Sequence, residues 1–424
     1  MKMNPLALAL AGAIACAPAI VTAAPAPQSQ SQSATTGANA DPAAVRQLEE
    51  VEVTANVYRD RTEATAPTLS YDLEYFQRFE PLTVGDMLKR VPSVAFLSDV
   101  LEYDGVRLRG LDPGYTQILI NGERIPGAGF DRSFFVDRIP AELVERIEIV
   151  RSASADRSGD AIAGTLNIVL RDGYSLDGGY VRLGGLNYDD GVTRGTGGVV
   201  WGGEFGPGRM LLGANVQGRR NPKDKFSQRF DEPGGELDNT EVQTDVRSGT
   251  DYSANASYIL PIDGGQLDFS AFYVRTDRVQ IEDSIEYRSG IQTDPNILTL
   301  NENDVDIETR NWNVEGSWRQ EAYGGDNKLR LGYARFDDEQ FEFENEIEFL
   351  RDTRPFPEDD RFTGDQDFTA LEDREFSADF SHERGDESLL WKFGVQYTAK
   401  ARDTSLLTDR NRITIPNAPA PRPV

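Results

Sequence analysis

The chain has 424 residues, of which 71 are acidic and 44 are basic, so that its formal net charge is −27. This excess of negative charge argues against a nucleic-acid partner, because nucleic-acid binding needs a basic surface. Beyond residue 23 no run approaches the roughly 18 apolar residues of a membrane-spanning helix, so a membrane-bound mature chain must use strands or a peripheral surface.

Residues 1–23 predict a signal peptide for export. Lys2 supplies the positive start, residues 6–15 form an apolar core, and the small residues of Val-Thr-Ala at 21–23 provide a cleavage site. Cleavage there would remove Cys16, the only cysteine, and with it any disulfide or cysteine-bound metal. A lipoprotein signal ending at Cys16 stays an alternative. The predicted destination is the periplasm or beyond it.

Residues 24–46 are rich in Pro, Ser, Gln and Ala and predict a disordered tether. Residues 47–60 then alternate apolar and acidic side chains like a strand. A single strand is not stable alone, so this segment is either an edge strand of the next domain or a segment that adds itself to another protein's sheet. Its place between a tether and a domain with its own strands favours the second interpretation.

Residues 61–173 predict a compact α+β domain. A short helix is expected over Thr83–Arg90, stopped before Pro92, and another from Pro140 to Val144. Strands are expected over 105–109, 117–120, 146–150 and 165–170, and Asn121-Gly122 predicts a hairpin turn.

Residues 174–424 alternate over long segments, with one face apolar and aromatic and the other polar. The face formed by Leu389, Trp391, Phe393, Val395 and Tyr397 is an example. We expect nine strands of roughly 10 to 18 residues, longer than the 5 or 6 usual in soluble sheets. Short turns are expected to alternate with long loops at about 219–242, 277–306 and 344–369. This arrangement favours an outer-membrane β-barrel over a soluble β-sandwich.

Two stretches resemble the plug domain of TonB-dependent receptors of the bacterial outer membrane. They are VRLRGLDPGYTQILINGERI at 106–125 and LVERIEIVRSASADRSGDAIAGTLNIVLRDG at 143–173. The resemblance implies an α+β plug domain followed by an antiparallel transmembrane β-barrel, of which this chain holds about nine of roughly 22 strands. The predicted organisation is therefore signal peptide 1–23, tether 24–46, TonB-box region 47–60, plug 61–173 and N-terminal barrel portion 174–424.

The resemblance also implies a function. It identifies the TonB box with Glu50, Val51, Glu52, Val53, Thr54 and Ala55. The periplasmic protein TonB would pair with this segment by strand addition and use the inner-membrane proton gradient to drive import of a scarce ligand, such as a ferric siderophore or an oligosaccharide. The resemblance implies no enzyme activity and no cofactor.

Two groups of charged residues are candidates for contacts. By the resemblance, Arg107, Arg109, Glu148 and Arg151 would pair with opposite charges on the barrel wall; ordinary surface charge is the alternative. Arg219, Arg220, Lys223 and Lys225 form a basic island that would suit an anionic ligand. The alternatives are a solvated loop or contacts with lipopolysaccharide phosphates.

Other ligand classes find less support. The only histidine, His382, is expected beside a periplasmic turn, which argues against axial histidine ligation of haem at the outer mouth. The acidic segment 351–368 has the chemistry for calcium but no specific ligand spacing, and no carboxylates there predict a catalytic pair.

Nine strands are too few for a closed receptor barrel, so the sequence predicts the front portion of a receptor. Two other classes stay open. One is a surface-exposed, adhesin-type barrel that binds without active transport, and the other is a secreted β-rich enzyme acting on glycans.

Overall fold

The computed structural model describes residues 59–61, 68–97, 105–124, 136–151, 161–293, 296–350, 359–385 and 389–416. All of them belong to one compact unit, Asn56–Val424. The predicted signal peptide, the tether and the TonB box Glu50–Ala55 lie outside the described residues. No helix among the described residues is long and apolar enough to cross a membrane.

The α+β domain is built on a six-stranded sheet, the small sheet. Its strands are β1 (Arg59–Arg61), β2 (Thr68–Asp72), β5 (Thr116–Ile120), β6 (Glu123–Arg124), β7 (Val144–Val150) and β8 (Gly164–Leu170). They lie in the order β1-β2-β7-β8-β5-β6, and only β5 and β8 are parallel. A separate pair joins β3 (Val94–Ala95) to β4 (Arg107–Leu108).

Among the described residues, five short helices connect these strands. They are α1 (Leu73–Gln77), α2 (Val84–Leu88) and the 3₁₀ turns η2 (Pro113–Tyr115), η3 (Val136–Arg138) and η4 (Ala141–Leu143). Helix α2 begins where predicted, because Thr83 and Asp86 form a reciprocal capping box at its start. The expected helix after Pro140 is the single 3₁₀ turn η4.

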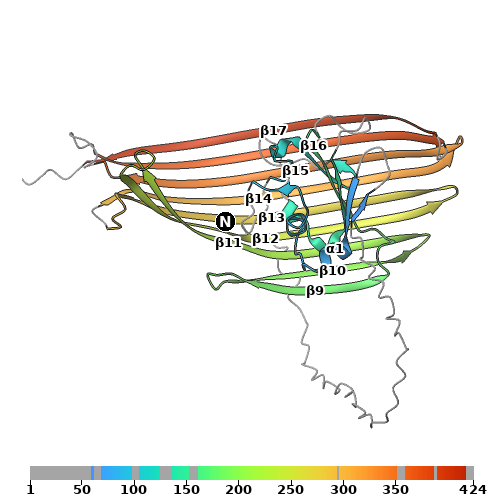
Figure 1. Cartoon of the computed structure of the whole chain (residues 1–424), viewed down its shortest axis with the longest axis horizontal. Coiled ribbons are helices and arrows are strands. Elements are labelled where there is room, and N and C mark those ends of the chain that lie inside the picture. The colour runs from blue at the N-terminus through green and yellow to red at the C-terminus, as the bar shows by residue number, and fades with distance from the viewer. Residues whose placement is uncertain are drawn as a thin grey trace, which may run out of the picture. The chain divides into compact units, whose positions relative to one another are not determined.

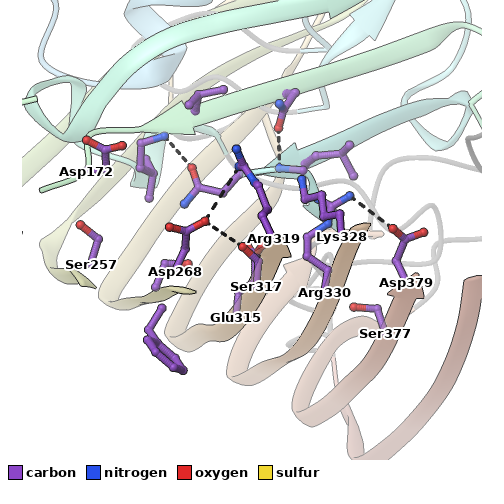
Figure 2. Close-up of a pocket in the computed structure, with 18 of the residues that line it drawn as sticks. Asp172, Ser257, Asp268, Glu315, Ser317, Arg319, Lys328, Arg330, Ser377 and Asp379 are labelled. Atoms are coloured by element: carbon purple, nitrogen blue, oxygen red, sulfur yellow. Dashed lines mark hydrogen bonds and ion pairs between the residues drawn. The ribbon is translucent and has the colours of Figure 1, made fainter. Parts of the chain in front are cut away.

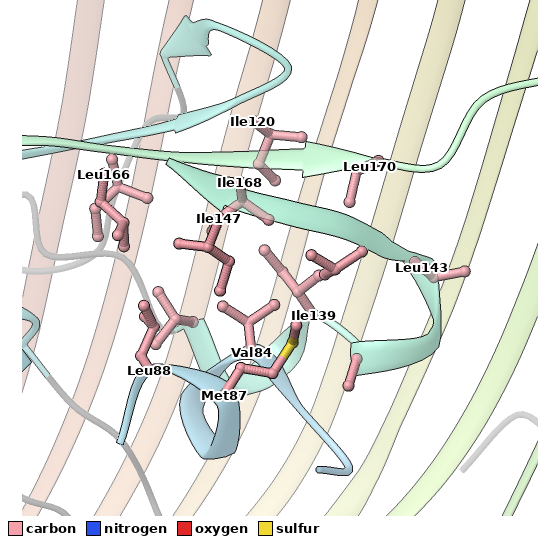
Figure 3. Close-up of a cluster of buried hydrophobic side chains, with 14 of the residues drawn as sticks. Val84, Met87, Leu88, Ile120, Ile139, Leu143, Ile147, Leu166, Ile168 and Leu170 are labelled. Carbon is pink, nitrogen blue, oxygen red and sulfur yellow. The ribbon is translucent and has the colours of Figure 1, made fainter. Parts of the chain in front are cut away.

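A hydrophobic core lies between α2 and the small sheet. Val84, Met87 and Leu88 of α2 face Ile147 of β7 and neighbouring side chains of β8, and all three α2 side chains are fully buried (Figure 3). Burying each of these side chains stabilises the domain by about 1.5–3 kcal/mol. The alternation of Ile and charged residues in β7 places its isoleucines on this core.

The remaining strands form a nine-stranded sheet, the large sheet, in which every neighbouring pair is antiparallel and follows chain order (Figure 1). Its strands are β9 (Gly178–Asn187), β10 (Thr193–Phe205), β11 (Gly208–Phe230), β12 (Leu237–Ile262), β13 (Gly265–Arg288), β14 (Ile297–Ala322), β15 (Gly325–Glu348), β16 (Asp360–Gly385) and β17 (Leu390–Ile415). The predicted number of strands is confirmed. Within the described sheet, β9 and β17 each pair on one side.

The predicted strand lengths are wrong. Strands β11–β17 have 23 to 26 residues, and the segments expected as long loops are largely strand. Acidic and amide side chains are frequent there and interrupt the apolar alternation, although Val279, Ile281 and Phe341 are still exposed as large apolar side chains. The backbone ladder nevertheless continues, and cross-strand pairs such as Asn301 with Glu344 (2.8 Å) and Asn303 with Glu342 (2.7 Å) accompany it.

The two faces of the large sheet differ in polarity. The inner face, toward the α+β domain, buries polar side chains such as Thr276, Asn311 and Asn313. The outer face exposes large apolar side chains, among them Phe269 (49% exposed) and Val314 (46%). A soluble sheet buries its apolar face, so this polarity is that of a membrane barrel strand.

Candidate functional site

Residues 136–145 of the α+β domain lie against the inner face of the large sheet. The Asp137 carboxylate contacts Arg219 of β11 at 2.6 Å and Arg278 of β13 at 3.4 Å. Both arginines also contact Asp251 of β12, at 3.1 and 3.6 Å. Arg138 donates to the Thr309 hydroxyl of β14 at 2.7 Å. Asp137, Arg138, Arg219, Asp251 and Arg278 form what we call the Asp137 cluster.

The Asp137 cluster is largely buried, and its opposite charges are paired. Burial raises the pKa of Asp137, but the guanidinium groups of Arg219, Arg278 and Arg138 together lower that pKa below its ordinary value. Burial and the charge of Arg278 lower the pKa of Arg138 below its ordinary value, and the opposing effect of Asp137 and Asp251 is smaller. Buried charges are tolerated when they are paired, and removing one partner of such a pair costs about 3–5 kcal/mol. The cluster therefore holds the domain to three strands at once.

A second polar contact lies one turn further along the chain. The buried Glu142 carboxylate accepts hydrogen bonds from Asn215 (2.7 Å) and Arg182 (3.2 Å). The Ser175 hydroxyl donates to Glu145 at 2.8 Å. These hydrogen bonds are directional and involve charged groups. They therefore fix the position of the segment 136–145 on the large sheet while burying little apolar surface.

The four plug charges predicted to contact the wall have other partners among the described residues. Arg107 contacts Asp112 at 3.7 Å, and Arg109 donates to the main-chain oxygen of Arg151. Arg151 donates to Ser93 at 3.3 Å.

Glu148 accepts from Arg146 and Asn167, both at 2.8 Å. All these partners lie within the α+β domain, so wall contact by the four residues stays a prediction. Asp137, Arg138 and Glu142 contact the large sheet but were not predicted from the sequence. A signal was present, because Asp137 and Arg138 interrupt the apolar run Phe-Phe-Val-Asp-Arg-Ile at 134–139.

The basic island is part of strand β11, and its placement in a loop was wrong. Arg219 belongs to the Asp137 cluster, whereas Arg220 contacts Asp190 at 2.5 Å. Lys225 contacts Asp245 at 3.1 Å, and Lys223 is half-buried. Because successive strand residues face opposite sides, Arg219 and Arg220 cannot share one ligand. Ligand binding by this group stays a prediction.

A polar cavity of about 640 Å³ lies between the small sheet and the inner face of β12–β17 (Figure 2). Its wall carries both signs of charge. Asp268 accepts from Ser317 at 2.9 Å and lies 3.9 Å from Arg319, while Arg330 lies 4.0 Å from Asp379. Such a lining can hold a hydrophilic ligand and its water.

The hairpin of the small sheet closes one side of this cavity. A Cβ atom added at Gly122 would lie 2.5 Å from the Arg330 guanidinium, so the turn and the wall are in close contact. Asn121 and Gly122 also bond β8 through Leu170 and Asn167, each at 2.8 Å. In the described parts of the chain no group of three or more His, Cys, Asp or Glu residues is arranged to hold a metal ion.

Residues 60–165 match the family model described as TonB-dependent Receptor Plug Domain. Among solved structures, the chain is similar to the ferric citrate transporter FecA in its unliganded form, at 13% identity with a TM-score of 0.39. It is also similar to the ferric-catecholate import receptor Fiu from E. coli K12, at 12% identity with a TM-score of 0.37. A third similar structure is the siderophore receptor PirA from Acinetobacter baumannii, at 11% identity with a TM-score of 0.32.

These likenesses cover 81%, 84% and 80% of this chain and 60%, 67% and 77% of the three structures, in the same order. The chain thus spans 60% of the length of FecA. The matched family and these proteins are receptors and transporters, not enzymes.

Proposed function

Since this chain carries a TonB-dependent receptor plug domain at residues 60–165, as its sequence predicted, we propose that it acts in the outer membrane as an energy-coupled import receptor. Proteins of this family are outer-membrane proteins, and the polar inner and apolar outer faces of the large sheet support that location. The observation that carries the proposal is the attachment of the plug to this inner face through the Asp137 cluster.

In the proposed cycle, TonB grips residues 50–55 by strand addition. The next element of the chain is β1, which lies at the edge of the small sheet and pairs only with β2 within the described residues. A pull on the box therefore loads the β1–β2 ladder first and then β7, which follows β2 in the sheet. Residues 136–143 precede β7 directly, so force on β7 reaches the Asp137 cluster.

The ligand class that we propose is a hydrophilic molecule too scarce or too large for passive entry, such as a ferric siderophore or an oligosaccharide. The mixed charges that line the cavity, including Asp268 and Arg319, support a ligand that carries its own hydrogen-bonding groups. The cavity lies beside the plug hairpin, so a movement of that hairpin away from Arg330 would widen it. No covalent step is required.

Val53→Pro tests the energy coupling, because proline removes a backbone donor from the added strand. Cells expressing the full chain would be given radiolabelled ferric citrate, a ferric catecholate chelate and a labelled maltodextrin in turn. We expect one of them to be taken up by the parent and lost in Val53→Pro, with surface binding unchanged. Ser33→Pro, in the tether, is the matched control and should import normally.

Two outcomes contradict the proposal. Uptake that is equal in the parent and in Val53→Pro would mean that transport does not use the box. Binding without any uptake by the parent would favour the adhesin-type alternative. A soluble periplasmic protein that hydrolyses a glycan would favour the enzyme.

A further inference from the structure

Three cations lie next to each other on the inner face of the large sheet, at its short-turn end. Arg319 is directly across from Lys328 in the register of β14 and β15. Arg330 follows Lys328 by two residues on β15, so it lies on the same face. Lys328 itself is close to the turn, three residues beyond Gly325, where β15 begins. We call Arg319, Lys328 and Arg330 the cation trio.

The cation trio lines the polar cavity between the plug and the large sheet (Figure 2). The plug hairpin lies against one member of the trio, because a Cβ atom added at Gly122 would lie 2.5 Å from the Arg330 guanidinium. A group that binds the trio would therefore lie inside the cavity, with the strands on one side and the plug on the other.

The carboxylates beside the cation trio contact its arginines and not its lysine. Asp268 lies 3.9 Å from Arg319, and Asp379 lies 4.0 Å from Arg330. Both distances exceed the roughly 2.7–2.9 Å of a direct charge-assisted hydrogen bond. Among the described residues, the Lys328 ammonium group makes no hydrogen bond and no ion pair. Lys328 is thus a cation in the cavity that has no direct counter-charge.

The more distant charges do not compensate Lys328 either. The two arginines of the cation trio act on Lys328 more strongly than the carboxylates of Glu315 and Asp379 do. Like charges directly opposite each other destabilise a sheet, as Arg319 and Lys328 would here. A charge that is partly removed from bulk water needs a partner of opposite sign. An anion inside the cavity would supply that partner.

We propose that the cation trio binds an oxyanion, a carboxylate or phosphate group, inside this cavity. The ammonium group of Lys328 is a compact charge with three donors, and the guanidinium groups beside it offer paired donors that match carboxylate and phosphate oxygens. The role of the site rests on the import function proposed above, in which the short turns lie on the periplasmic side. The trio would then be the last site that an anionic ligand contacts before it leaves the lumen.

This site distinguishes between the ligand classes that the import function leaves open. A ferric carboxylate chelate or a phosphorylated sugar carries the oxyanion that Lys328 requires. A neutral oligosaccharide carries none, so its hydroxyl groups would leave Lys328 without a counter-charge. The cation trio therefore favours an anionic ligand over a neutral one.

The test measures oxyanion binding to the full chain, purified in detergent micelles at low ionic strength. Calorimetric titrations use citrate, inorganic phosphate and the neutral sugar maltotriose. In parallel, mass spectrometry follows the acetylation of Lys328 and of Lys392, a lysine of β17 that lies 3.9 Å from Glu383 and outside the cavity lining. We expect citrate or phosphate, but not maltotriose, to slow the acetylation of Lys328 severalfold and to leave that of Lys392 unchanged. Whichever of the two anions binds identifies the oxyanion as carboxylate or phosphate.

Substitutions at Lys328 then locate the bound anion. Lys328→Gln removes the charge and should weaken binding about tenfold or more, whereas Lys328→Arg keeps the charge and should bind almost as the parent does. Lys392→Gln is the matched control and should leave binding unchanged. Equal binding by the parent and Lys328→Gln overturns the proposal, and so does an equal loss in Lys392→Gln. Acetylation of Lys328 that neither anion slows also overturns it.

If Lys328→Gln does not fold, Asp268→Asn decides, because it removes the carboxylate that competes with an anion for Arg319. Asp268→Asn should bind the oxyanion severalfold more tightly, and unchanged or weaker binding overturns the proposal. Binding is measured without TonB, so it is distinguished from uptake. A chain that binds the oxyanion but does not import it contradicts the import function alone.

Discussion

Replacing Asp137 by asparagine keeps the shape of the side chain and removes the charge at the centre of the plug attachment. At an effective dielectric constant of 20, the contacts at 2.6 and 3.4 Å to Arg219 and Arg278 correspond to about 6 and 5 kcal/mol of gross attraction. The variant regains several kcal/mol because a carboxylate no longer has to be desolvated. The net loss should therefore be about 3–5 kcal/mol.

Hydrogen exchange of the full chain in detergent micelles measures this loss locally. Amides of residues 136–150 should exchange roughly a hundredfold to a few thousandfold faster in Asp137→Asn, since each 1.4 kcal/mol is a factor of ten. Asp112→Asn is the control, because it makes the same change at an exposed ion pair. The Asp112 side chain is 79% exposed, and its contact with Arg107, at 3.7 Å, is longer than those of Asp137. Exchange that rises by less than threefold in Asp137→Asn, or equally in the control, would refute the reasoning.

The pKa of Asp137 is lower in the folded chain than the ordinary value near 3.9, so its contribution to stability should be constant from pH 5 to 8 and decline only as the pH falls below about 4. The difference in melting temperature between the parent and Asp137→Asn, followed against pH, checks this; a decline between pH 6 and 8 would contradict it. Gly164→Ala should destabilise the plug by about 3 kcal/mol, because its φ is +132° and the new Cβ would lie 2.7 Å from the Val150 carbonyl oxygen. Gly110→Ala, at φ +71° in open space, should cost only about 1–2 kcal/mol in the same chemical unfolding experiment. Leu88→Ala should lower the free energy of unfolding by about 2–5 kcal/mol, whereas Leu97→Ala, at 51% exposure, should change it little.

The small sheet and the count of strands in the large sheet were predictable because local chemistry specifies them. Asn121-Gly122 favours the tight turn between β5 and β6, and Thr83 with Asp86 favours a helix start through its capping box. The extent of the long strands was not predictable. Beyond Arg310 on β14 and Arg335 on β15, acidic and amide residues interrupt the apolar alternation, so the sequence no longer shows which segments pair.

The plug attachment was also beyond sequence reasoning, for a different reason. Arg107 and Arg109 stand in the most recognisable motif, but they satisfy neighbours within the domain. Asp137 and Arg138 meet their partners only across sequence separations such as the 171 residues between Arg138 and Thr309. A charged residue inside an apolar segment, such as Asp137 within residues 134–139, is expected to need a partner of opposite charge. The sequence does not show which residue that partner is.

The order of strands in the small sheet has a consequence for assembly. Strand β8 joins β7 to β5, so the sheet is incomplete until residue 170 has emerged, yet every partner it needs precedes that point. Each strand after β9 pairs with the one made just before it. Contacts that are close in sequence form quickly. The plug can thus finish folding before its enclosing sheet exists, and that sheet then grows hairpin by hairpin beside a domain that is already complete.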